Sequence, residues 1–132
     1  MLGFVVALLL VACQQQDAAA SLGQPFELAP GQPVTISETG LQVQFNAVTE
    51  DSRCPAQVQC IWAGRASVEL ALIAPNVAPE TVTLSTCCGP DQTHYEYAGQ
   101  AIDLHGVAPG PGRPGAAISD ADYRAQVTVN SL

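Results

Sequence analysis

The stretch LQVQFNA, residues 41–47, alternates apolar and polar side chains with a period of two. In an extended chain its polar residues would face one side, and the other side would carry Leu41, Val43, Phe45 and Ala47. This period is typical of a strand that buries one face and exposes the other. The stretch therefore predicts a half-buried strand of an antiparallel sheet.

The same alternation returns at residues 66–74, 81–85 and 123–129, with turn-forming Gly, Pro and Asp residues between the segments. No stretch after residue 20 has a sustained helical period. The strands are expected at about 25–28, 33–38, 41–49, 65–74, 80–86, 93–98, 101–107 and 122–130. We therefore predict an all-β fold, an antiparallel β-sandwich or small barrel of about 7–8 strands.

Composition excludes two classes of partner. The chain of 132 residues suffices for one domain, and its formal net charge is −8. Its four basic residues are all arginines, so no basic stripe is available to neutralise phosphate groups. We expect neither nucleic-acid binding nor electrostatic attraction to anionic lipid.

The N-terminus has the features of an export signal. Residues 2–12 form an apolar run that is too short to span a bilayer but has the length of a signal-peptide core. The run ends in Leu10-Val11-Ala12-Cys13, which resembles the lipobox of bacterial lipoproteins. This resemblance implies cleavage after Ala12 and acylation of Cys13, and two or three acyl chains anchor a protein durably. The alternative is an ordinary secretory signal with an incidental cysteine.

These features divide the chain into a signal peptide at 1–12, a lipidated N-terminus and flexible tether at 13–24, and a β-sandwich domain at 25–132. Gln14 follows the cysteine, and in enteric-type bacteria this resembles the signal for the outer membrane. The expected location is the bacterial cell envelope, with the domain facing the periplasm or associated with the outer membrane. Five cysteines in a short exported chain predict disulfides.

Residues 51–64, DSRCPAQVQCIWAG, contain two cysteines and the chain's only tryptophan. Cys54 and Cys60 are placed to close a short loop by a disulfide. The alternation directs Trp62 toward the core, where an indole and a disulfide commonly pack together. Gly64 suits a bulge or a positive φ before the next strand begins. Every residue of the stretch thus has a structural role that needs no ligand.

The stretch also resembles a set of small exported bacterial proteins, many of them lipoproteins. Their shared feature is D-S-R-C-P followed by a short spacer and C-x-W-x-G, which here runs from Asp51 to Gly64. Arg53 within this motif has Glu50 and Asp51 as ready partners. The resemblance implies a fold and a compartment, and no settled activity comes with it.

A second cysteine pair, Cys87 and Cys88, ends a predicted strand and departs from that resemblance. Four cysteines allow three pairings. One consists of Cys54–Cys60 with an uncommon bridge between the two neighbours, and the other two join residues 87 and 88 to the 54–60 loop. We favour the local Cys54–Cys60 bridge. A four-cysteine zinc site is the competing hypothesis, although the spacing does not match the usual zinc motifs.

Both histidines of the chain lie in residues 94–105, HYEYAGQAIDLH. A two-residue turn at Gly99-Gln100 would make this segment a hairpin, because glycine is preferred at the first position of a type II′ turn. That register places His94 directly opposite His105 on the polar face.

The predicted polar face also carries Glu96 opposite Asp103. Facing carboxylates repel each other, and a zinc or copper ion held by both imidazoles would relieve the repulsion. The alternative is a solvated face with no metal, screened by water and by Arg113 or Arg124. No other cofactor is indicated.

Residues 106–116, GVAPGPGRPGA, are expected to form a surface loop because their prolines cannot continue a strand ladder. Nucleophile-elbow, zinc-protease and nucleotide-binding motifs are absent from the sequence. The sequence therefore indicates no enzyme and favours a lipid-anchored binding or structural module with an envelope partner. The alternatives are a periplasmic copper- or zinc-binding protein and an inhibitor of extracytoplasmic proteases that presents this loop.

Overall fold

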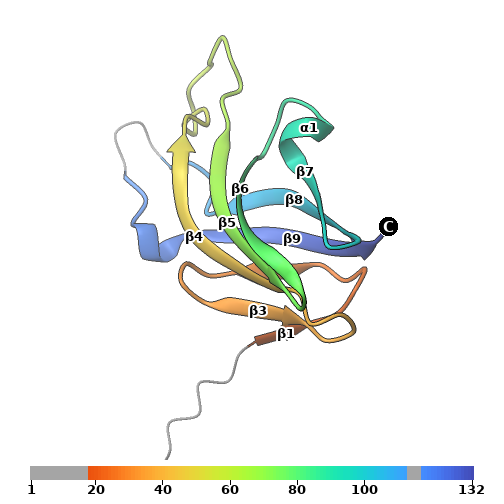
Figure 1. Cartoon of the computed structure of the whole chain (residues 1–132). Coiled ribbons are helices and arrows are strands. Elements are labelled where there is room, and N and C mark those ends of the chain that lie inside the picture. The colour runs from red at the N-terminus through yellow and green to blue at the C-terminus, as the bar shows by residue number, and fades with distance from the viewer. Residues whose placement is uncertain (1–17, 113–116) are drawn as a thin grey trace, which may run out of the picture.

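The alternating segments pair into two sheets that pack face to face (Figure 1). The computed structural model describes residues 18–112 and 117–132. The strands are β1 (Ala18–Ala20), β2 (Phe26–Leu28), β3 (Pro33–Ile36), β4 (Gln42–Asp51), β5 (Ala66–Ala74), β6 (Val77–Ser85), β7 (His94–Tyr97), β8 (Gln100–Ala108) and β9 (Arg124–Ser131). Sheet A has the order β1-β3-β4-β5-β6 and sheet B the order β2-β9-β8-β7. The all-β sandwich is confirmed, and the two sheets do not close into a barrel.

The core lies between the sheets and is built from the apolar positions of the alternating segments. Alternate residues of β5 and β9 point inward, and the polar residues between them are more exposed, except for Ser67, which is buried and hydrogen-bonded to Ser85. The largest fully buried side chains are Leu28, Ile36, Leu41, Val43, Phe45, Val68, Leu70, Leu72, Leu84, Ile102, Val127 and Val129. Each contributes roughly 1.5–3 kcal/mol through burial, so this core is the main source of stability.

One inward assignment is wrong. Ala47 is exposed, because a β-bulge between Phe45 and Ala47 shifts the register of β4 against β5. The extra residue reverses the alternation, so Val48 packs against the core instead.

Strand β1 lies in the segment expected to be a flexible tether. Ala18–Ala20 pair with β3 in a parallel register, whereas every other pairing between two of these named strands is antiparallel. The parallel pairing arises because the chain crosses to sheet B as β2 before it returns as β3. Strand β1 therefore adds one parallel edge pair to the predicted antiparallel sandwich.

The predicted signal peptide at 1–12 and the lipidated Cys13 lie outside the described residues. Within residues 18–112 and 117–132, no helix has the length and apolar character needed to cross a bilayer. The helices there are α1 (Pro90–Thr93) and a 3-10 turn (Asp120–Asp122).

Candidate functional site

Arg53 joins three segments at one end of the sandwich. Its Nε and Nη2 donate to the two carboxylate oxygens of Asp51 at 2.8 and 2.9 Å. Its Nη1 donates to the Val107 carbonyl at 2.7 Å, and Nη2 also donates to the Pro109 carbonyl at 3.0 Å. The Tyr123 hydroxyl donates to Asp51 at 2.8 Å. The motif arginine thus ties the β4–β5 loop, residues 52–65, to the segments that end β8 and begin β9.

The same contacts shift three pKa values. Hydrogen bonds from Arg53 lower the pKa of Asp51 to about 2, against the opposing effect of partial burial. Hydrogen bonding to the Asp51 carboxylate raises the pKa of Arg53. Burial and the hydrogen bond to Asp51 raise the pKa of Tyr123. Of the two carboxylates expected beside Arg53, Asp51 is its partner, whereas Glu50 pairs with Arg65.

Gly64 closes the base of the β4–β5 loop. It has a φ of +66°, and a Cβ added there would lie 1.8 Å from the Ser52 carbonyl oxygen. The loop ends are joined because the Ser52 amide donates to the Arg65 carbonyl at 2.8 Å. The Arg65 amide in turn donates to Ser52 Oγ at 3.1 Å. This close approach of two backbones leaves room only for glycine.

Both disulfides are local. Cys54–Cys60 closes a loop at the far end of the molecule from β1, and Cys87 is bonded to its neighbour Cys88. The long-range pairings and the four-cysteine zinc site are excluded, because all four sulfurs are engaged in these two bonds. The Sγ of Cys87 lies 3.7 Å from the Gly64 carbonyl oxygen, so the second disulfide packs against the β4–β5 loop.

Trp62 does not point into the core. Its exposed fraction is 82%, and that of its neighbour Ile61 is 94%. The expectation fails because β4 ends at Asp51 and β5 begins at Ala66, so the strand alternation does not extend through the loop. The loop instead carries two neighbouring large apolar side chains into solvent, and exposed apolar patches mark interaction surfaces.

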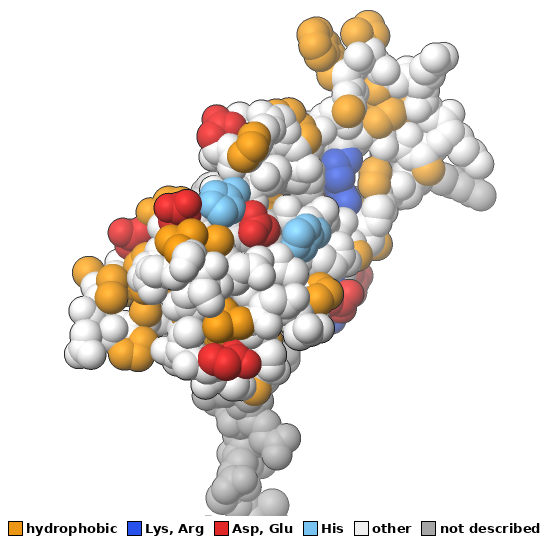
Figure 2. All heavy atoms as spheres, turned by 90° about the vertical axis from the view of Figure 1, so that its right-hand side faces the viewer, with side chains coloured by type: hydrophobic (Ala, Val, Ile, Leu, Met, Phe, Trp, Pro, Cys, Tyr) orange, Lys and Arg blue, Asp and Glu red, His pale blue; other side chains and the backbone are white. Residues whose placement is uncertain are grey.

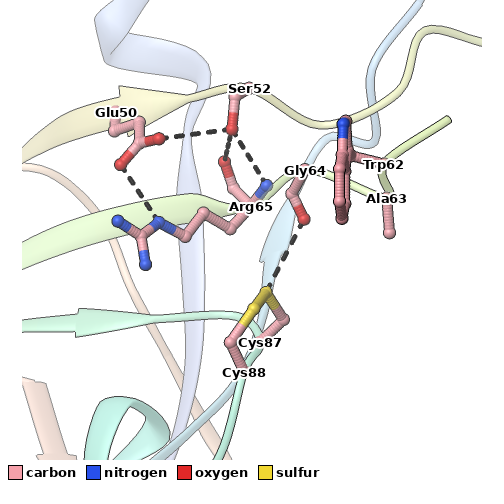
Figure 3. Close-up of a pocket in the computed structure, with 8 residues that line it drawn as sticks. All are labelled: Glu50, Ser52, Trp62, Ala63, Gly64, Arg65, Cys87 and Cys88. Carbon is pink, nitrogen blue, oxygen red and sulfur yellow. Dashed lines mark hydrogen bonds and ion pairs between the residues drawn. A yellow bond between two sulfur atoms is a disulfide. The ribbon is translucent and has the colours of Figure 1, made fainter. Parts of the chain in front are cut away.

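A pocket of about 500 Å³ lies between the β4–β5 loop and the Cys87–Cys88 bridge (Figure 3). Its lining residues come from β4, the loop and the turn after β6: Glu50, Ser52, Trp62, Ala63, Gly64, Arg65, Cys87 and Cys88. One flat face of the indole is turned toward the side where Gly64 and Ser52 lie. Pockets of this size are typical of small-ligand sites.

The histidine hairpin forms with a different register. The turn is Ala98-Gly99, and both residues have positive φ, +52° and +74°, as a type I′ turn requires. His94 therefore lies opposite Asp103 instead of His105. Gln100 belongs to β8, where its buried side chain accepts a hydrogen bond from Thr39 Oγ1 at 2.7 Å.

Replacing Ala98 with asparagine is expected to stabilise the protein by about 0.5–1 kcal/mol. Asparagine tolerates positive φ better than alanine, and Asn-Gly is a preferred type I′ pair. Urea unfolding followed by far-UV circular dichroism measures the change. Ala78→Asn, at an exposed position of β6 outside the positive-φ residues, is the control and is not expected to stabilise. A loss of stability in Ala98→Asn would contradict this turn assignment.

His94 is held between two carboxylates on the outer face of sheet B. Its Nδ1 lies 2.7 Å from Asp103, and its Nε2 lies 3.6 Å from Glu96. His105 is engaged separately, with Nε2 2.6 Å from Thr128 Oγ1. Figure 2 shows the two histidines in a row with an acidic side chain between them. The prediction that His94 lies directly opposite His105 is therefore wrong.

The described residues contain no group of three or more His, Cys, Asp or Glu side chains arranged to hold a metal ion. The hydrogen bond with Asp103 is the main cause that raises the pKa of His94, so a protonated imidazole itself can neutralise the carboxylates. Zinc or copper binding by His94, Glu96, Asp103 and His105 stays a prediction. Titration with either metal while the histidine NMR signals are observed tests it.

The raised pKa of His94 predicts a pH-dependent stability. Its ion pairs stabilise the fold fully below the unfolded-state pKa of about 6.5, and the contribution is lost as pH rises through the higher folded-state value. His94→Gln is therefore expected to be less stable than wild type at acidic pH, with a difference that shrinks at alkaline pH. Urea midpoints across this range measure the effect. His105→Gln is the control and should keep the pH dependence of wild type. If His105→Gln lost that dependence, the assignment of the effect to His94 would be contradicted.

The predicted 106–116 loop begins later than expected. Gly106, Val107 and Ala108 pair with β9, and Pro109 is the first residue that cannot donate to the ladder. Gly112 accepts a hydrogen bond from the Ala56 amide at 3.0 Å, so the described part of this loop rests against the β4–β5 loop. Residues 113–116, including Arg113, lie outside the described residues.

No protein-family model, curated protein or solved structure matches this chain. Its function is therefore inferred from the geometry of the chain itself. The pocket residues Glu50, Ser52 and Arg65 were not identified from the sequence, where nothing distinguishes them from ordinary polar residues beside a turn. The sequence predicts the Cys87–Cys88 bridge only as part of one of three pairings, and nothing in it indicates that this bridge lines a pocket.

Proposed function

We propose that this protein is a lipid-anchored module of the bacterial cell envelope that binds another envelope component through its β4–β5 loop. The observation that carries the proposal is the exposure of Trp62 and Ile61 on a loop closed by the Cys54–Cys60 disulfide. Tryptophan is enriched among the residues that dominate binding energies. A constrained loop also loses less conformational entropy on binding. No catalytic step is part of the proposal.

The arrangement of the molecule supports an anchored orientation. Strand β1 lies at one end of the sandwich and the β4–β5 loop at the other (Figure 1). Acyl chains on Cys13, five positions before β1, would hold the β1 end against a bilayer. The β4–β5 loop would then point away from that bilayer, toward other components of the envelope.

Site-specific photo-crosslinking in intact cells tests the binding surface. A photoreactive residue in place of Ile61 is expected to give a defined crosslinked product. The same residue in place of Val77, which is exposed at the turn between β5 and β6, is the control and should give none. Equal labelling from both positions, or none from Ile61, would overturn the proposed surface.

Mass spectrometry of the mature N-terminus tests the anchor independently. We expect a peptide that begins at Cys13 and carries acyl groups. An uncut chain or an unmodified Cys13 would remove the lipid anchor from the proposal and leave the binding surface to be judged by crosslinking.

A further inference from the structure

The pocket beside Trp62 has two chemically different walls. One wall is apolar and is formed by the indole of Trp62, Ala63 and the Cys87–Cys88 disulfide. The opposite wall is polar and carries Glu50 and Arg65, with Ser52 beside them (Figure 3). A ligand that fills this pocket must satisfy both walls.

The polar wall offers donors and acceptors side by side. Arg65 Nε donates to Glu50 at 3.1 Å, and its Nη1 donates to Gln92 at 2.7 Å. Among the described residues its Nη2 has no hydrogen-bond partner, and the second Glu50 oxygen receives only a long 3.3 Å bond from Ser52 Oγ. The Arg65 and Glu50 side chains are 38% and 43% exposed, so these groups are accessible from the pocket.

The charge of this wall argues against an ionic ligand. Arg65 and Glu50 neutralise each other, and each would repel an ion that the other attracts. The net charge of −8 further opposes an anion. A purely apolar ligand is also disfavoured, because it would take the free N–H and carboxylate groups out of water without replacing their hydrogen bonds.

A neutral ring that carries several hydroxyl groups satisfies both walls. Adjacent hydroxyls each donate and accept, so one can donate to Glu50 while the next accepts from Arg65 Nη2. The C–H face of the same ring can lie flat on the indole of Trp62, as aromatic side chains favour for apolar surfaces. We propose that the pocket binds a sugar unit of a neutral glycan, stacked on Trp62 and held by Glu50 and Arg65.

The pocket is held in shape before any ligand enters. The backbone contact between Gly64 and Ser52 fixes the loop base, and the Cys87–Cys88 disulfide packs against the Gly64 carbonyl oxygen at 3.7 Å. A site that needs little ordering keeps more of its contact energy as affinity. This inference deepens the proposed function, because it names the ligand class for the same end of the molecule.

The chain's only tryptophan lies in the pocket, so its fluorescence reports directly on binding. The probes are chitotetraose, cellotetraose and maltotetraose, added to the purified domain. At least one is expected to change the emission, with a Kd of about 0.1–1 mM. A response to chitotetraose alone assigns N-acetylated glycans, and a response to the other two assigns plain glucans.

Three variants test whether the sugar contacts Trp62 and Glu50. Their sugar affinities are measured by calorimetry, because Trp62→Ala removes the fluorescent side chain. Trp62→Ala and Glu50→Gln are each expected to weaken the responding sugar by about tenfold or more. Glu50→Gln keeps the side-chain shape, and circular dichroism confirms that both variants fold. Ile73→Ala, on the exposed face of β5 and outside the pocket lining, should bind as wild type does.

If none of the three sugars changed the emission at about 10 mM, the inference would be overturned. Binding by Trp62→Ala that is as strong as that of wild type would also overturn it. Displacement of a bound apolar dye, with no sugar response, would assign the pocket to an apolar side chain of a protein partner and would likewise overturn it. Crosslinking from position 61 in cells is measured separately. A crosslink without sugar binding would leave the proposed function standing and remove only the glycan.

Discussion

Gly64→Ala is expected to lower the free energy of unfolding by more than about 3 kcal/mol. The new Cβ would lie 1.8 Å from the Ser52 carbonyl oxygen and 2.5 Å from its carbonyl carbon, distances that non-bonded atoms do not reach. Because both neighbours are backbone atoms, the clash can be relieved only by opening the base of the β4–β5 loop. Urea unfolding followed by far-UV circular dichroism measures the loss.

Gly31→Ala is the matched control for backbone conformation. Gly31 has a φ of +77°, close to that of Gly64, but a Cβ there would meet no atom within 4 Å. Its substitution is expected to cost only about 1 kcal/mol, the penalty of positive φ alone. Equal losses in the two variants would show that the close approach to Ser52 contributes nothing.

Arg53→Ala is expected to destabilise the protein by about 2–4 kcal/mol. The substitution removes both hydrogen bonds to Asp51 and leaves the carbonyls of Val107 and Pro109 without this donor. Arg124→Ala is the control, because Arg124 bonds only to the nearby Ala121 and Tyr123 carbonyls among the described residues. Its cost should stay below about 1 kcal/mol. A cost for Arg53→Ala no larger than this would contradict its role as a tie between loops.

The stability of the protein at acidic pH tests the Arg53–Asp51 pair through the ionisation of Asp51. The pKa of Asp51 is lowered to about 2, so its contribution is present above its unfolded-state value of about 4 and is lost as pH falls toward 2. Asp51→Asn should therefore be less stable than wild type at neutral pH, and the difference should shrink as pH falls through 2. A difference that does not change over this range would mean that ionisation of Asp51 does not matter.

The body of the fold could be predicted because burial imposes a period of two on each strand. Val68 and Val127 face the core where the alternation places them. Ala47 departs from the pattern because a bulge adds one residue, and a bulge leaves no mark in an apolar–polar alternation. Strand β1 was missed because three alanines carry no pattern at all.

The hairpin shows how a small turn decides a side-chain constellation. Gly99-Gln100 and Ala98-Gly99 are both acceptable two-residue turns. Moving the turn back by one residue shifts the partner of each β7 residue by two positions along β8. Alanine is rare at positive φ, so the sequence did not indicate a turn at Ala98-Gly99. Because of this shift, His94 lies opposite Asp103 and not opposite His105. An ion pair between His94 and Asp103 therefore takes the place of the expected pair of metal-binding histidines.

The pocket could not be predicted, because its walls come from segments far apart in the chain. Glu50 is the penultimate residue of β4, Trp62 lies in the following loop, and Cys88 follows β6. Once a loop leaves the sheet, no periodicity states which way its side chains point. The direction of Trp62 could be found only from the structure.

Both sulfur bridges close short segments, and neither spans the two sheets. In the chain-entropy account, a seven-residue ring such as that of Cys54–Cys60 contributes about 2.4 kcal/mol, which is small beside the apolar interior. The polypeptide is therefore expected to collapse into its double-layered body while its thiols are still reduced. Oxidation would come last and would finish only the end that carries the β4–β5 loop, so a preparation from reducing cytosol should be well folded yet poor in the binding that we propose for that loop.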